Sequence, residues 1–203
     1  KELSTTKLLD TDAEGRGQDP QLLAAAEIIR ELNPDVLILN EIDLDIDAYL
    51  SGMDYSLNAE RFKNAYLNPE DELRDYPYIF AAPSNTGILS GLDLDNNGKI
   101  ATAKDLGTRD YGGDSFGYGI YPGQYAMAVL SRYPFLKSEI RSFQNFLWKD
   151  LPDNLIPGDW YSQDEIEIFR LSSKSHWDVP VVINHNDIPL LLSHPTPLVS
   201  HGQ

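Results

Sequence analysis

The sequence contains no cysteine in its 203 residues. Disulfide-bonded scaffolds, thiolate zinc sites and thiol nucleophiles are therefore excluded. The lack of thiols does not identify the compartment, because proteins without cysteine occur in both reducing and oxidising environments.

Basic residues are also scarce. Sixteen lysines and arginines stand against thirty-two aspartates and glutamates, which gives a net charge of -16. A protein that coats nucleic acid normally needs a basic surface, so this balance argues against that class. It fits better with a small phosphorylated substrate, or with a site at which metal ions supply the positive charge.

Long apolar runs are the third absence. No stretch of about eighteen apolar residues is present, so we expect no membrane-spanning helix. We find no signal peptide, but Lys1 is not a natural start, and we expect the chain to be a processed or trimmed piece. Repeats, low-complexity segments and linkers are absent too, so residues 1–203 are expected to form one domain.

The most informative stretch that is present lies between Pro34 and Asp43. Its apolar run from Val36 to Leu39 is typical of a strand buried on both faces. The run ends in Asn40 and Glu41, and ligands of open α/β sheets gather at such strand ends. Glu41 is therefore a candidate functional carboxylate; the alternative is that it begins a solvated loop.

Capping residues, periodicity and apolar runs predict the remaining elements. Residues 1–18 are expected to form a loop. We expect helices between Asp19 and Pro34, over residues 45–53 and 56–67, and from residue 162, and strands or extended segments over residues 76–82, 125–130, 135–143, 171–183 and 189–193. Residues 83–124 show little periodicity, and a loop of this length is usually functional or else disordered.

The segment that begins at Asp93 resembles the first half of a calcium loop. Asp93, Asp95 and Asn97 supply oxygen side chains at alternate positions, and Gly98 makes the turn. Lys104 stands where the closing acid is usual, so the motif is incomplete. We name the three oxygen-bearing residues as candidate calcium ligands; an Asp/Asn/Gly turn without metal is the alternative.

Two further positions are candidates because of their surroundings. Asn85, in the sequence Asn-Thr-Gly, could contact a phosphate or belong to an ordinary turn. His194 follows the apolar run 190–192 and, like Glu41, lies at the exit of a buried strand. For His194 the alternative is a capping or surface histidine.

A polar cluster interrupts the predicted strand over residues 171–183. Lys174, Ser175 and His176 offer an ammonium, a hydroxyl and an imidazole in succession. Side chains that alternate along a strand in this way could line an anion site. A solvated edge strand is the alternative.

The order of these segments along the chain is similar to that in the endonuclease/exonuclease/phosphatase superfamily. The strand ending Asn-Glu-Ile-Asp comes first, then the segment Ala-Met-Ala-Val-Leu-Ser-Arg-Tyr-Pro, then Ser-Ser-Lys-Ser-His-Trp-Asp and finally Leu-Ser-His-Pro. The superfamily shares the fold of deoxyribonuclease I, and the chain resembles a bacterial, often exported branch of it. The resemblance implies an α+β fold, a four-layer α/β/β/α sandwich of the deoxyribonuclease I type, and an extracellular or periplasmic location.

The resemblance also implies roles for individual residues. Glu41 is expected to bind a catalytic Mg²⁺ or Mn²⁺ ion, and His194 to contact the scissile phosphate, with His176 as a third catalytic candidate. The expected substrate-binding residues are Asn40, Asn85, Lys174 and Ser175. The implied reaction is hydrolysis of a phosphodiester or phosphomonoester by a metal-activated water. The acidic charge favours a small or lipid-like phosphorylated substrate over duplex DNA.

The chain departs from the pattern of the superfamily at both ends. Its first strand would precede Lys1, and a Gly-Asp-x-Asn segment and an Asp-His pair would follow Gln203. We therefore expect an incomplete sandwich, with no phosphoesterase turnover by this chain alone. The alternative function is a non-catalytic, calcium-stabilised binding domain on the same scaffold.

Overall fold

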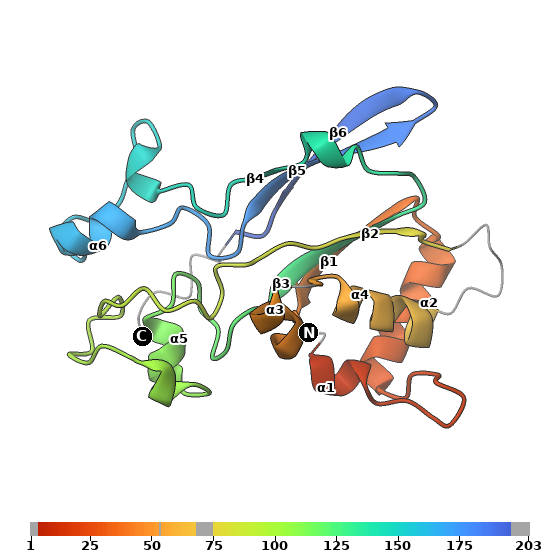
Figure 1. Cartoon of the computed structure of the whole chain (residues 1–203), viewed down its shortest axis with the longest axis horizontal. Helices are drawn as coiled ribbons and strands as arrows, with labels where there is room; N and C mark the ends of the chain where they lie inside the picture. Colours follow the sequence, from red (N-terminus) through yellow and green to blue (C-terminus); the bar gives the residue numbers. More distant parts are fainter. Residues whose placement is uncertain (1–3, 53, 68–74, 196–203) are drawn as a thin grey trace.

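A computed structural model describes residues 4–52, 54–67 and 75–195 of the chain (Figure 1). Its strands form two antiparallel sheets of three strands each. The first sheet has the order β1-β3-β2 and contains β1 (Val36–Ile42), β2 (Tyr78–Phe80) and β3 (Ala126–Ser131). The second has the order β4-β5-β6 and contains β4 (Arg141–Ser142), β5 (His176–Ile183) and β6 (Asn186–Ser193).

Helices of the described residues are short. The α-helices are α1 (Thr5–Leu8), α2 (Pro20–Leu32), α3 (Ile46–Ser51), α4 (Leu57–Phe62), α5 (Arg109–Gly113) and α6 (Gln163–Ile168). A π-helical turn, η1 (Lys63–Leu67), continues α4, and 3-10 turns lie at η3 (Ala103–Asp105), η4 (Lys137–Glu139) and η5 (Trp148–Asp150). None of the helices that the structure describes is long and apolar enough to cross a membrane.

The helix α2 forms as its capping residues predict. The side chain of Asp19 accepts hydrogen bonds from the amides of Gln21 and Leu22, which satisfies two backbone donors at the helix start. The helix ends at Asn33, in the left-handed conformation, just before Pro34. Its inner face buries Leu22 and Ala26.

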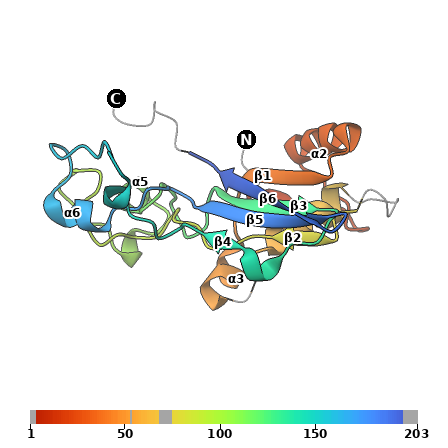
Figure 2. The same cartoon turned by 90° about the horizontal axis from the view of Figure 1, so that it is seen from above.

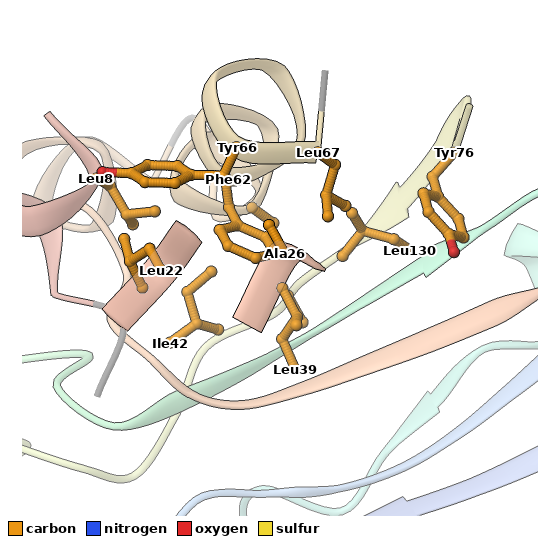
Figure 3. Packing of buried hydrophobic residues seen from close by; sticks show 12 residues of the cluster. Leu8, Leu22, Ala26, Leu39, Ile42, Phe62, Tyr66, Leu67, Tyr76 and Leu130 are labelled. Atoms are coloured by element: carbon orange, nitrogen blue, oxygen red, sulfur yellow. The ribbon is translucent and has the colours of Figure 1, made fainter. Parts of the chain in front are cut away.

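The first hydrophobic core lies between the helices and one face of the first sheet (Figure 3). Leu22 and Ala26 of α2, Phe62 of α4 and Tyr66 meet Leu39, Ile42 and Leu130 of the sheet. The second core lies between the two sheets. It contains Met127 and Val129 of β3, Phe135, Trp177, Val179 and Val181 of β5, and Leu192 of β6.

Strand β3 is buried along its whole length because it lies between these two cores. It is the middle strand of the first sheet, and successive side chains alternate between the two faces. Ala128 and Leu130 face the helices, while Met127 and Val129 face the second sheet. The prediction of a fully buried strand is confirmed here.

The described residues therefore form helices, a first sheet and a second sheet in successive layers, seen from two directions in Figures 1 and 2. The mixed helix and sheet content confirms the predicted α+β fold. The far face of the second sheet exposes Leu191, with 79% of its surface accessible. Helix α6 lies beyond the end of the sheets rather than over this face (Figure 1). The described part thus shows three of the four expected layers.

One structural prediction is wrong for β1. The run from Val36 to Leu39 was expected to be buried on both faces, but Ile38 is 44% exposed. The physical reason is the position of β1 at the edge of its sheet, where the second sheet does not cover Ile38. Leu39, on the opposite face, is buried against the helices as expected.

Most other elements lie within a few residues of their predicted positions. Ser162 and Glu165 form the predicted capping box of α6. Two elements are additional to those expected: α1 lies in the expected N-terminal loop and α5 in the long segment 83–124. The turn η4 lies within the expected extended segment 135–143, β5 begins later than expected, at His176, and β6 begins earlier, at Asn186. The helix expected over residues 45–53 includes residue 53, which lies outside the described residues.

The two faces of β1 should respond differently to truncation. We expect Leu39→Ala to lower the free energy of unfolding by about 2–5 kcal/mol, because it opens a cavity in the first core. Ile38→Ala, its neighbour on the exposed face, should cost about 1 kcal/mol or less. Urea unfolding of both variants measures this difference, and equal losses would contradict the edge position of β1.

Candidate functional site

Glu41 occupies a β-bulge at the end of β1. The register of β1 against β3 shifts between Asn40 and Ile42, and Glu41 has a positive φ of 61°. Such a backbone conformation is uncommon for a residue other than glycine, and strain of this kind clusters at functional sites. The bulge also changes which side chains face the helices.

Regular alternation along β1 would direct Glu41 into the first core. Leu37 and Leu39 face the helices, so a strand without a bulge would continue with Glu41 on that face. The extra residue instead brings Ile42 into the core, where it is 1% exposed. The Glu41 carboxylate thereby turns out of the core, and its side chain is 44% exposed.

His194 lies beside this carboxylate. It follows directly after β6, and the distance from its Nε2 to the Glu41 Oε1 is 3.5 Å. Two residues earlier, Leu192 faces the core between the sheets, so alternation carries His194 toward the same side. The structure thus brings together two predicted residues that are far apart in the sequence, from the ends of two different sheets.

Lys174 contributes a positive charge to the same place. It is 9% exposed, and this burial lowers the pKa of its ammonium, whereas the charge of Glu41 acts in the opposite direction. The attraction between the two charges places Lys174 near Glu41, where its ammonium could attract an incoming anion. Glu41, His194 and Lys174 therefore form a candidate site between the ends of the two sheets, which we call the Glu41 site.

The two residues after Lys174 lie on different faces of the second sheet. Trp177 faces the core between the sheets, so alternation along β5 sets His176 on the opposite face, beside Ser193 of β6. Burial lowers the pKa of His176, which favours the neutral ring. Ser175 is fully buried, and its hydroxyl lies 3.2 Å from that of Ser142. The predicted catalytic and substrate-binding roles of these two residues stay predictions.

Asn85 has its polar side-chain atoms engaged within the protein. It is fully buried, and its Nδ2 donates to the carbonyls of Gln144 and Ser172 at 2.8 and 2.7 Å, while its Oδ1 accepts from Arg170. These hydrogen bonds connect the long segment 83–124 with the residues that lead into β5. The substrate contact of Asn85 stays a prediction, as does that of Asn40, which is exposed at the end of β1.

The predicted calcium loop contributes to a second cluster. Ligand atoms of Asp93, Asp95 and Asp114 lie within 4.8 Å of one another. Asp114 is fully buried and accepts hydrogen bonds from the amides of Leu94 and Ala101 at 2.9 and 2.6 Å. Burial raises the pKa of Asp114, and the charges of the other two carboxylates act in the same direction.

Sequence reasoning missed Asp114 and named Asn97 instead. Asp114 follows α5 and is 20 residues beyond Leu94, so no spacing rule connects it with the loop. The Asn97 side chain accepts a hydrogen bond from the amide of Lys99 and so helps to form the turn. The role of Asn97 as a calcium ligand stays a prediction.

The two clusters differ in the number of carboxylates that they offer. Within the described ranges, Asp93, Asp95 and Asp114 are the one group of three or more ligating side chains. The Glu41 site offers a single accessible carboxylate. One carboxylate can be sufficient for a divalent ion that keeps several waters and also binds substrate phosphates.

Comparison with known proteins shows the family of the chain. The sequence model of the Endonuclease/Exonuclease/phosphatase family matches residues 11–164. This range includes the Glu41 bulge and the acidic cluster, and it ends before Lys174 and His194. A search of curated proteins and a search of solved structures each found no match. The matched residues are well over half of the chain, so the chain belongs to the Endonuclease/Exonuclease/phosphatase family.

Proposed function

We propose that the protein is a metal-dependent phosphoesterase in which Glu41 holds a Mg²⁺ or Mn²⁺ ion and His194 contacts the scissile phosphate. The family consists generally of metal-dependent phosphoesterases and nucleases, so hydrolase chemistry is the starting point. The observation that carries the proposal is the left-handed bulge that turns Glu41 out of the core and sets it 3.5 Å from His194.

Each side chain of the Glu41 site has a chemical task in this proposal. The bound ion would polarise the phosphoryl oxygens and lower the pKa of a coordinated water. Glu41 supplies the anionic oxygen that holds such an ion at the strand end. His194, 19% exposed beside it, can donate a hydrogen bond to a phosphoryl oxygen as negative charge develops there.

Lys174 is the proposed electrostatic contact for the substrate phosphate. Its ammonium is nearly buried, so its attraction for an anion is less screened by water than that of a surface lysine. The net charge of -16 opposes a long polyanion such as duplex DNA. We therefore propose a small or lipid-like phosphorylated substrate. The resemblance to an often exported branch of the superfamily is the basis for proposing an extracellular or periplasmic place of action.

The metal role of Glu41 can be tested without turnover. Wild-type protein should melt at a higher temperature with Mn²⁺, by an amount equivalent to about 2.7 kcal/mol at a hundredfold excess over the dissociation constant. Glu41→Gln should lose this gain because the amide carries no charge. Thermal unfolding and isothermal titration with Mn²⁺ measure the effect.

Two controls make that experiment specific. Glu27→Gln changes an exposed glutamate of α2 and should respond to Mn²⁺ like wild type. The series is repeated in an Asp114→Asn background, so that ions held by the acidic cluster do not contribute. An equal response of Glu41→Gln and wild type in that background would exclude Glu41 as the ligand.

Lys174 should make stability depend on pH. Burial lowers the pKa of Lys174 in the folded state, so the unfolded chain binds more protons. Below the folded-state pKa, the buried ammonium therefore lowers the free energy of unfolding by its full amount. This destabilisation disappears as the pH rises toward the unfolded value of about 10.4. Urea unfolding should therefore show Lys174→Met more stable than wild type at pH 7, with the difference shrinking toward pH 10.

A matched substitution and a ligand complete the Lys174 experiment. Lys104→Met, at an exposed lysine of η3, should show no comparable pH-dependent difference. Inorganic phosphate should raise the melting temperature of wild type more than that of Lys174→Met. Identical phosphate responses would remove Lys174 from the proposed substrate contact.

A second candidate function is favoured by the buried carboxylate of Asp114. In a non-catalytic binding domain stabilised by Ca²⁺, the ion would be held by Asp93 and Asp95 of one loop and by Asp114, the residue that follows α5. Because burial and its neighbours disfavour the ionised form of Asp114, a bound cation would relieve the repulsion. A calcium-stabilised loop is also compatible with the phosphoesterase, since the two clusters share no residue.

Calcium should therefore stabilise the fold through Asp114. We expect Ca²⁺ to raise the melting temperature of wild type, and Asp114→Asn or Asp93→Asn to abolish most of that gain. Asp187→Asn, at an exposed carboxylate of β6, is the control for general screening of the acidic surface. If Ca²⁺ stabilises Asp114→Asn as much as Asp187→Asn, the acidic cluster is a turn without metal.

A further inference from the structure

Asp43 lies two residues after Glu41 and is almost completely buried, with 1% of its surface exposed. Its carboxylate accepts a hydrogen bond from the Tyr125 amide at 2.9 Å and another from the Tyr121 hydroxyl at 2.5 Å. Both partners belong to the segment that leads into β3. The carboxylate therefore connects the exit of β1 with the start of its neighbouring strand.

A second residue of this connection has an unusual backbone. Tyr125 has a positive φ of 56°, like Glu41 with 61°. The two lie next to Ile42 and Ala126, which are paired across the β1–β3 ladder. Two left-handed residues other than glycine thus flank one strand pair, and the Asp43 carboxylate binds the amide of one of them. Each such conformation is costly and persists only where surrounding contacts determine it.

Further contacts leave little freedom around Asp43. Its carbonyl accepts from the Asn58 Nδ2, and the Leu44 amide donates to the Gly123 carbonyl, each at 2.8 Å. Gly123 has a φ of +80°, and a Cβ at this position would lie 2.7 Å from the Cβ of Leu44. The chain segments therefore cross closely here, and only a residue without a side chain fits the crossing.

We infer that Asp43 is a positioning residue for Glu41: its carboxylate fixes the start of β3 and thereby the bulge that turns Glu41 out of the core. Asp43 is 1% exposed and its carboxylate accepts hydrogen bonds from Tyr121 and Tyr125, so it acts through the backbone rather than on a ligand. The positioning of Glu41 is a property of the metal-free protein. The expected effect of Asp43 on metal binding rests on the proposed function of Glu41.

The inference is tested with two separate readouts on the full chain. Backbone NMR of the metal-free protein reports the conformation of Glu41, because Cα and Cβ chemical shifts differ between left-handed and extended residues. Titration calorimetry then measures the affinity for Mn²⁺. The variants are Asp43→Ala, Asp43→Asn and Tyr121→Phe, with Val181→Ala in the second core as a control for lost stability.

Asp43→Ala should move the Glu41 shifts away from left-handed values and weaken Mn²⁺ binding by roughly tenfold or more, as loss of groups that orient a ligand does. Asp43→Asn keeps an oxygen acceptor for the Tyr125 amide and should retain the shifts and most of the affinity. Val181→Ala should retain both although it is less stable. If Asp43→Ala does not fold, Tyr121→Phe, which removes only one hydroxyl, should give a smaller loss in both readouts.

Each contrary result has a distinct meaning. Left-handed shifts in Asp43→Ala, or no change of either readout in Tyr121→Phe, would overturn the inference. Loss of affinity in Asp43→Asn with unchanged shifts would mean that Asp43 acts on the ion itself, which also overturns it. If the shifts change in Asp43→Ala but wild type and Glu41→Gln bind Mn²⁺ equally, the positioning role stands and the proposed metal role of Glu41 fails.

Discussion

The candidate site depends on one local conformation, the left-handed bulge at Glu41. Without it, the two-residue period of β1 would direct this carboxylate into the first core behind Leu37 and Leu39. With the bulge, Ile42 takes the buried position. Glu41 then lies at the end of the first sheet, beside His194 at the end of the second sheet. The conformation is costly for glutamate, so neighbouring contacts must hold it, and Asp43, two residues further on, makes such contacts.

The packing of the two sheets supplies the other half of the site. Met127 and Val129 of β3 pack against Trp177 and Val179 of β5, and this core sets the ends of the two sheets beside each other. Lys174 lies two residues before β5 and His194 directly follows β6, so both are close to strand ends. Such placement suits a site that must hold charged groups at fixed distances.

Local signals in the sequence predicted much of this arrangement, and long-range contacts account for the rest. The cap of α2 and the buried run of β3 depend on neighbouring residues and were predicted correctly. The exposure of Ile38 depends on the strand order, and the bulge depends on the register with β3, neither of which a single strand reveals. Asp114 reaches the acidic loop only through the tertiary fold.

We propose that the bulge makes Glu41 a metal ligand. A crystal structure of the protein soaked in Mn²⁺, with anomalous scattering used to locate the ion, tests this proposal. We expect an anomalous peak within coordination distance of the Glu41 carboxylate, near His194. A peak confined to Asp93, Asp95 and Asp114, with none at Glu41, would contradict it.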